Sequence, residues 1–96
     1  MRYDFEWDTS KAKLNIEKHG VVFQRAATIF KDPYAISIFD DEHSENEDRW
    51  ITIGMDSGGI LLVVSHTFRR VGESLCHIRI ISSRKAIKKE KKQYEE

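Results

Sequence analysis

The chain has little cysteine, little proline and no long apolar run. Its single cysteine, Cys76, can form no internal disulfide and offers no paired-cysteine zinc site, which fits a reducing compartment. The longest strictly apolar stretch is "ILLVV" at residues 60–64, far shorter than a membrane span. The opening "MRYDFEWD" is too acidic and too poor in apolar residues for a secretory signal. We therefore expect a cytoplasmic globular protein without membrane contact.

Several motifs that carry chemistry are also missing. There is no glycine-rich phosphate loop followed by lysine, and no nucleophile elbow. The acidic stretch "DDEHSENED" at residues 40–48 lacks the central glycine and the spacing of a calcium loop. We expect neither a metal site nor a cofactor.

The charges balance in total but not along the chain. The sequence holds 16 Lys and Arg against 16 Asp and Glu. The first 48 residues contain six basic and eleven acidic side chains, and the last 48 contain ten and five. This asymmetry suggests a charged site or an electrostatic partner, although a solvated polar surface would give the same counts. Ninety-six residues, without a linker or an internal repeat, predict one domain over 1–96.

Hydrophobic periodicity predicts an α+β fold. Before Pro33, an aromatic strand is followed by two helices, the first capped by the Asp/Thr/Ser cluster at 8–10 and ended by Gly20. After Pro33 the period becomes two, and the stretch at 60–68 is apolar on both faces, which places it inside a sheet. We expect two N-terminal helices packed on an antiparallel sheet, with a C-terminal helix from Ser82 or Ser83. The expected strands are 3–7, 34–39, 49–55, 60–68 and 75–82.

The segment "RIISSRKA" at 79–86 places cations in two unfavourable positions. Strand alternation puts Cys76, Ile78 and Ile80 on one face and His77, Arg79 and Ile81 on the other. Arg49 and His66, on neighbouring strands, could then converge with His77 and Arg79 on a concave sheet surface. An ordinary exposed face with a long arginine is the alternative.

A helix that begins at Ser82 or Ser83 would carry Arg84 and Lys85 at the positive end of its dipole. Each cation there costs roughly 0.3–1 kcal/mol. Backbone N–H groups, a hydroxyl and two cations would together bind a phosphate, which would explain the arrangement.

Motifs along nearly the whole chain resemble the BrnT family of type II toxin–antitoxin toxins, which are small ribonucleases with a RelE-like fold. The matching pieces are "FEWD", "KHGV", "F..AA..F.DP", "D.EHSE.E.R", "LLVV.HT", "RIIS.R.A" and a closing "E...YE". Ser83 departs from the pattern, since the family often has alanine there.

The resemblance implies a metal-independent endoribonuclease that inhibits translation. Cleavage would proceed by attack of the ribose 2′-oxygen on its own phosphate. It also implies a BrnA-like antitoxin in a 2:2 complex, with DNA contacted only through the antitoxin. The residues we expect to be catalytic are His19, Arg49, Arg79, Arg84 and Tyr94, and those we expect to contact RNA are His66, His77, Ser83, Lys85 and Lys89.

Most of these residues also have a structural alternative. His19 could bond the last carbonyls of a helix, His66 could be the polar end of a buried strand, and Tyr94 could anchor the last helix. Arg49 could pair with Glu47 or Asp48, while His77 and the C-terminal lysines could simply be solvated. For the whole chain, the alternative function is an RNA- or ribosome-binding module that does not cleave.

Overall fold

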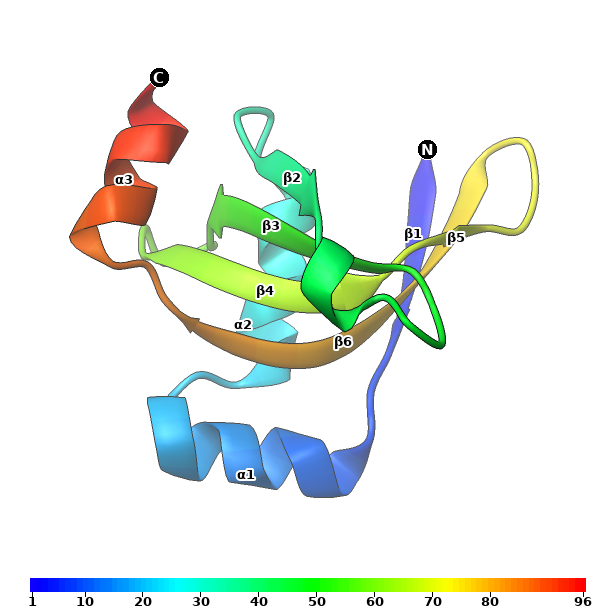
Figure 1. Cartoon of the computed structure of the whole chain (residues 1–96), viewed down its shortest axis with the longest axis horizontal. Helices are drawn as coiled ribbons and strands as arrows, with labels where there is room; N and C mark the ends of the chain where they lie inside the picture. Colours follow the sequence, from blue (N-terminus) through cyan, green and yellow to red (C-terminus); the bar gives the residue numbers. More distant parts are fainter.

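The computed structural model describes all residues, 1–96, as a mixed α+β fold with one twisted sheet (Figure 1). The sheet has the order β1-β6-β4-β3-β2, and the short β5 also pairs with β6. None of the helices is long and apolar enough to cross a membrane. The strands are β1 (Arg2–Glu6), β2 (Ile36–Phe39), β3 (Arg49–Met55), β4 (Leu61–Thr67), β5 (Arg69–Arg70) and β6 (Leu75–Lys85). The helices are α1 (Thr9–His19), α2 (Phe23–Ala27) and α3 (Lys88–Glu95), with the short 3₁₀ helices η1 (Thr28–Lys31) and η2 (Asp41–His43).

The predicted interior strand is confirmed, because β4 lies between β3 and β6 and pairs antiparallel with both. The sheet as a whole is mixed rather than antiparallel, because β1 pairs parallel with β6. The helices between β1 and β2 carry the chain from one edge of the sheet to the other. β1 therefore pairs with β6, the last strand in the sequence, and not with β2.

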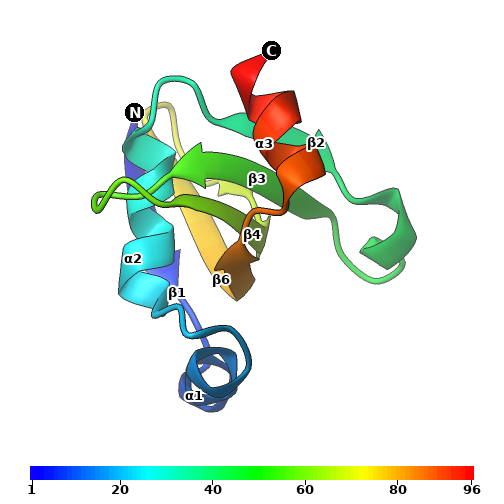
Figure 2. The ribbon, with the colours of Figure 1, turned by 90° about the vertical axis from the view of Figure 1, so that its left-hand side faces the viewer.

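The core lies between the sheet and the helices. Ala26 and Ile29 from the α2–η1 segment pack with Val64, Ile78 and Ile80 in one buried cluster. Figure 2 shows α2 on one side of the sheet and the loop that contains η2 on the other. We call the side away from α1 and α2 the outer face.

The caps of α1 follow the sequence prediction. The Asp8 carboxylate accepts hydrogen bonds from the N–H groups of Ser10 and Lys11, and Gly20 ends the helix with φ 68°. A left-handed residue at this position is cheap only for glycine. α1 thus begins directly after β1 and lies along β6, beneath it in Figure 1.

The predicted start of the last helix is wrong. Residues 82–85 continue β6 and pair with residues 62–65 of β4, and α3 begins only at Lys88. β4 is buried, so its backbone groups need partners along its whole length, and this outweighs the local capping tendency of two serines. Arg84 and Lys85 therefore do not face a helix dipole.

A bulge in β6 decides which residues share a face. The register pairs Ser65 with Ser82 but His66 with Ile80, so Ile81 has no partner on β4. Beyond the bulge the alternation reverses, and Ser83 is buried on the helix side with Ile80. Arg79 and Arg84, an odd and an even position, consequently both project from the outer face.

Asn15 ties α1 to this strand. Its side-chain amide donates to the carbonyl oxygens of Val21 and Ser83, both at 2.9 Å, and its Oδ1 accepts from the Ser83 N–H at 3.0 Å. The residue is only 4% exposed, so water cannot replace these bonds.

We predict that Asn15→Ala lowers the free energy of unfolding by about 3 kcal/mol, because buried backbone groups lose their partners. Urea denaturation monitored by circular dichroism measures this loss. The exposed Asn46→Ala is the matched control and should change stability by less than about 0.5 kcal/mol. Equal midpoints for the two variants would show that the Asn15 contacts do not hold the strand.

Candidate functional site

The outer face carries a groove of about 280 Å³ where β5, β6 and the end of β4 meet the acidic loop at 40–48. Arg69 and His77 lie opposite each other on β5 and β6, and Arg79 follows two residues further along the same side of β6. We call this the arginine groove. Its lining residues are Glu6, Glu47, Asp48, Thr67, Phe68, Arg69, His77 and Arg79.

Two arginines from different strands meet at one carboxylate. Arg79 donates a hydrogen bond to Glu47 Oε1, and the Arg49 guanidinium lies 3.6 Å from the same oxygen. Arg49 opens β3 opposite Thr67, whose hydroxyl accepts from the Arg79 backbone N–H at 3.3 Å. β3, β4 and β6 together therefore place the two guanidinium groups on the same anion. The predicted convergence of Arg49 and Arg79 is what the structure shows, and the predicted pairing of Arg49 with Glu47 is also present.

His77 has a carboxylate partner of its own. Its Nε2 lies 3.0 Å from Glu6 Oε1, across the parallel pairing of β1 and β6. The hydrogen bond from His77 lowers the pKa of Glu6, assisted by the positive charges of Arg79 and Arg69, while desolvation opposes the shift. Glu6 therefore stays ionised beside the groove.

Arg69 and Glu6 were not among the residues expected from the sequence. Arg69 belongs to "TFRR", directly after the apolar strand at 61–67. A cation at the end of a strand is the only sequence feature that could have pointed to it as a site residue. The stretch looked like the start of a turn, and the pairing of β5 with β6 could not be inferred from periodicity. Glu6 comes from a strand whose parallel pairing was not predicted.

Arg84 lies on the same face but at the other end of β6. It lies five positions beyond Arg79, or roughly 15 Å along a strand. Its guanidinium forms two parallel hydrogen bonds to Glu90, at 2.8 and 2.7 Å, and Glu90 also accepts from the Ile87 N–H at 2.9 Å. Arg84 is thus linked to the first turn of α3 through the Glu90 carboxylate. The charge at the positive end of the helix dipole is therefore an acid, not the two cations expected from the sequence.

Two residues that we expected to contact RNA are buried. His66 is 2% exposed and Ser83 is 1% exposed, both on the helix side. The Thr67 carbonyl oxygen can only accept, so His66 donates to it from Nδ1 at 2.9 Å. Its Nε2 then accepts from the Thr52 hydroxyl at 2.7 Å, and burial lowers its pKa. His66 is a neutral core residue, and the placement of both residues on the RNA surface is wrong.

His19 and Tyr94 lie away from the groove. His19 is the exposed last residue of α1, on the opposite side of the sheet. The Tyr94 hydroxyl donates to Asp32 Oδ2 at 2.6 Å, which raises the pKa of Tyr94 to about 12. Tyr94 therefore anchors α3 to Asp32, which is a structural role and not a catalytic one. Lys85 and Lys89 are exposed, Lys85 at the end of β6 and Lys89 on α3.

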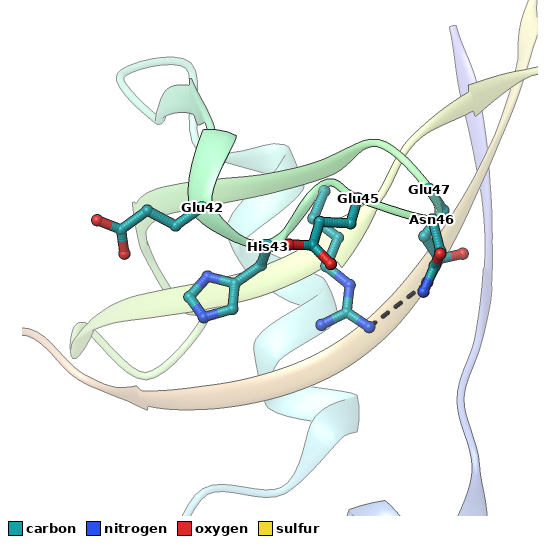
Figure 3. A pocket seen from close by; sticks show the side chains of 6 residues that line it. Glu42, His43, Glu45, Asn46 and Glu47 are labelled. Atoms are coloured by element: carbon teal, nitrogen blue, oxygen red, sulfur yellow. Dashed lines mark ion pairs between the residues drawn. The ribbon is translucent and has the colours of Figure 1, made fainter.

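A second hollow, of about 230 Å³, lies within the acidic loop itself (Figure 3). Figure 3 shows Glu42, Glu45 and Glu47 around it, with the ion pair to Arg49 as a dashed line. His43 is paired with Asp40 at 2.9 Å rather than with the groove. Arg49 lines this hollow, and Glu47 lines both the hollow and the arginine groove. The structure contains no cluster of three side chains that could hold a metal ion.

Comparison with known proteins gives a family and a fold. Residues 7–90 match a family model described as "Ribonuclease toxin, BrnT, of type II toxin-antitoxin system". The chain is also similar to the crystal structure of the Brucella abortus ribonuclease toxin BrnT, with 27% identity and a TM-score of 0.60. That match covers 92% of this chain and 100% of the Brucella chain. No curated protein matches the sequence significantly.

The pair of Arg84 and Glu90 gives a test by pH. The hydrogen bond from Arg84 lowers the pKa of Glu90 below its ordinary 4.5, so the pair stabilises the fold above that pH and ceases to do so as the pH falls. Glu90→Gln should lower the free energy of unfolding at neutral pH by less than about 1 kcal/mol, because the Arg84 side chain is 41% exposed.

This difference should shrink as the pH falls below 4.5 and the Glu90 carboxylate becomes protonated, measured by urea denaturation across the acid range. Glu95→Gln, at an exposed position on the same helix, is the control. A difference between wild type and Glu90→Gln that persists in acid would contradict a charge-based role for Glu90.

Proposed function

Because the chain belongs to the BrnT family of ribonuclease toxins of type II toxin–antitoxin systems, we propose that it is a metal-independent, RelE-like endoribonuclease that inhibits translation by cutting RNA. In this proposal the ribose 2′-oxygen attacks the adjacent phosphorus. The arginine groove holds the phosphate during this step.

The observation that carries the proposal is the convergence of Arg49 and Arg79 on Glu47. A site that brings two guanidinium groups to one carboxylate oxygen can do the same for a phosphate oxygen, because guanidinium groups bind both anions with the same fork of N–H donors. Charge grows on the non-bridging oxygens as the 2′-oxygen attacks, so fixed cations stabilise the transition state more than the ground state. Arg69 and Arg79 line the arginine groove, and Arg49 approaches it from the neighbouring hollow through Glu47, which lines both.

The rest of the outer face suits a strand of RNA. Arg84 lies on the same face, roughly 15 Å from Arg79, where it would meet a phosphate further along the strand and not the adjacent one. Lys89, exposed on α3, extends the positive charge beyond Arg84 and would contact the RNA backbone without reading its sequence. Lys85 pairs with the core residue Leu62, on the helix side of β6, so we do not assign RNA contact to it. We no longer assign RNA contact or catalysis to His19, His66, Ser83 or Tyr94, because their positions are buried or away from this face.

The family implies an antitoxin partner. We propose that this partner is a BrnA-like protein and that the two proteins form a 2:2 complex in the cytoplasm. In this complex only the antitoxin contacts DNA. β2 supports a protein partner, since it is an edge strand that exposes Ile38 (43%) and Phe39 (40%). Co-purification of the tagged chain with a small DNA-binding protein from its own operon tests this part of the proposal.

We predict that Arg79→Ala lowers the rate of RNA cleavage about a hundred- to a thousandfold, because a well-placed transition-state donor is lost. Arg79→Lys should recover only part of the rate, since an ammonium lacks the guanidinium fork. Arg70→Ala is the matched control and should cleave normally, because Arg70 bonds the carbonyl oxygens of Gly72 and Glu73 in the adjacent turn. Cleavage of a labelled RNA and thermal melting are measured on each variant.

Two outcomes would contradict this assignment. If Arg79→Ala unfolds the protein while the folded fraction cleaves normally, Arg79 is a structural ion-pair residue. If the wild type binds RNA and never cleaves it, the alternative of a binding module is correct.

Glu47 gives a second prediction. Its carboxylate competes with phosphate for Arg49 and Arg79, so Glu47→Gln should tighten binding of an RNA that lacks the 2′-hydroxyl at the cleavage site. Asp48→Asn is the neighbouring control; it removes the same charge but no ion pair with either arginine. Fluorescence anisotropy at several salt concentrations measures the affinity. Equal affinities for the two variants would show that phosphate does not bind where Glu47 sits.

A further inference from the structure

His77 is the only histidine that lines the arginine groove. It stands between two cations, with Arg69 opposite it on β5 and Arg79 two residues further along β6. A phosphate held by the arginines would therefore lie beside an imidazole, the side chain best suited to proton transfer near neutral pH.

Glu6 fixes which ring nitrogen is basic. A carboxylate only accepts hydrogen bonds, so the contact at 3.0 Å requires the hydrogen to be on Nε2 of His77. The neutral ring then has its free electron pair on Nδ1. The side chain of His77 is 28% exposed and lines the groove, so a ligand in the groove can reach the ring.

We propose that His77 is the general base of the cleavage reaction and that Glu6 is the positioning residue that holds its ring. This inference rests on the proposed ribonuclease function. Nδ1 takes the proton of the ribose 2′-hydroxyl, the bond between the 2′-oxygen and phosphorus forms, and the bond from phosphorus to the 5′-oxygen breaks.

The electron pair of the broken bond leaves on the 5′-oxygen, which takes a proton from water. The hydroxide that remains is neutralised by the proton that the imidazolium returns to solvent. The products are a 2′,3′-cyclic phosphate and a 5′-hydroxyl.

The groups that surround the imidazole fit this role. Phosphate approaches a site where arginines offset its charge, while Glu6 stabilises the imidazolium that forms when Nδ1 accepts the proton. The second carboxylate at the groove, Glu47, is held by Arg49 and Arg79 instead. The charged groups that face His77 from the neighbouring elements are Asp4 and Glu6 of β1, Arg69 of β5, Arg79 of β6, and Glu47 and Asp48 of the acidic loop.

The test compares two histidine–carboxylate pairs of the same protein. His77→Gln should lower kcat about a hundred- to ten-thousandfold, while affinity for an RNA without the reactive 2′-hydroxyl stays within a few fold. His43→Gln removes the exposed pair with Asp40 outside the groove and should cleave like wild type. Added imidazole should restore part of the rate of His77→Ala and none of the rate of Arg79→Ala.

Glu6→Gln tests the positioning role. It should lower kcat less than His77→Gln does and leave RNA affinity unchanged or slightly tighter, since a negative charge is removed. A histidine base makes the rate rise with pH, and this rise should be absent from His77→Gln.

Normal kcat in His77→Gln, together with a large loss in Arg79→Ala, would overturn the assignment of His77 and leave the ribonuclease function standing. A wild-type protein that produces no cyclic phosphate from any RNA would overturn both. A His77→Gln protein that melts early but keeps its rate per folded molecule would show that His77 is only structural.

Discussion

The bulge at Ile81 is the constraint on which the outer face depends. β6 is eleven residues long and pairs with β1 and β5 in its first half and with β4 in its second. Without the extra residue, Ile78 and Ser83 would lie on opposite faces, and so would Arg79 and Arg84. The bulge lets the core keep Ile80 and Ser83 on the helix side and leaves both arginines outside. The network between Asn15 and Ser83 then fixes this register to α1.

The basic side chains of the outer face are held mainly by nearby carboxylates. Arg49 and Arg79 share Glu47, His77 contacts Glu6, and Arg84 binds Glu90. These pairs balance most of the charge in the arginine groove, whose lining holds three carboxylates beside two arginines and a histidine. They also order the side chains before any ligand arrives, which reduces the entropy lost on binding. Because the pairs are partly exposed, each is weak enough for a phosphate to compete with it.

Much of the fold could be predicted from the sequence because its signals are local. The change of period at Pro33, the cap at Asp8, the left-handed Gly20 and the interior strand all depend on neighbouring residues. The end of β6 could not be predicted, because two serines before charged residues resemble a helix cap. Only the need of buried β4 for a partner makes them strand residues.

The residues of the site likewise divide into those that local sequence patterns predict and those that depend on strand pairing. Arg49 of β3 and Arg79 of β6, on either side of β4, could be brought together by strand alternation, and their shared contact with Glu47 agrees with that expectation. Arg69 and Glu6 could not, since each reaches the groove through a pairing with β6 that no periodicity reveals. His66 lies directly beside this region in sequence but points into the core, because its strand carries no bulge between residues 61 and 67. The resemblance to the BrnT family indicates a ribonuclease, but it does not indicate which of these side chains reach the groove.

The most direct test of the account is to locate the phosphate. In protein labelled with nitrogen-15, the guanidinium Nε–H signals are followed while a short RNA lacking the reactive 2′-hydroxyl is added. We expect the signals of Arg49, Arg69 and Arg79 to shift together with a single affinity, while those of Arg25 and Arg70 do not move. Shifts confined to Arg84 and the backbone of α3, with the groove arginines unchanged, would contradict it.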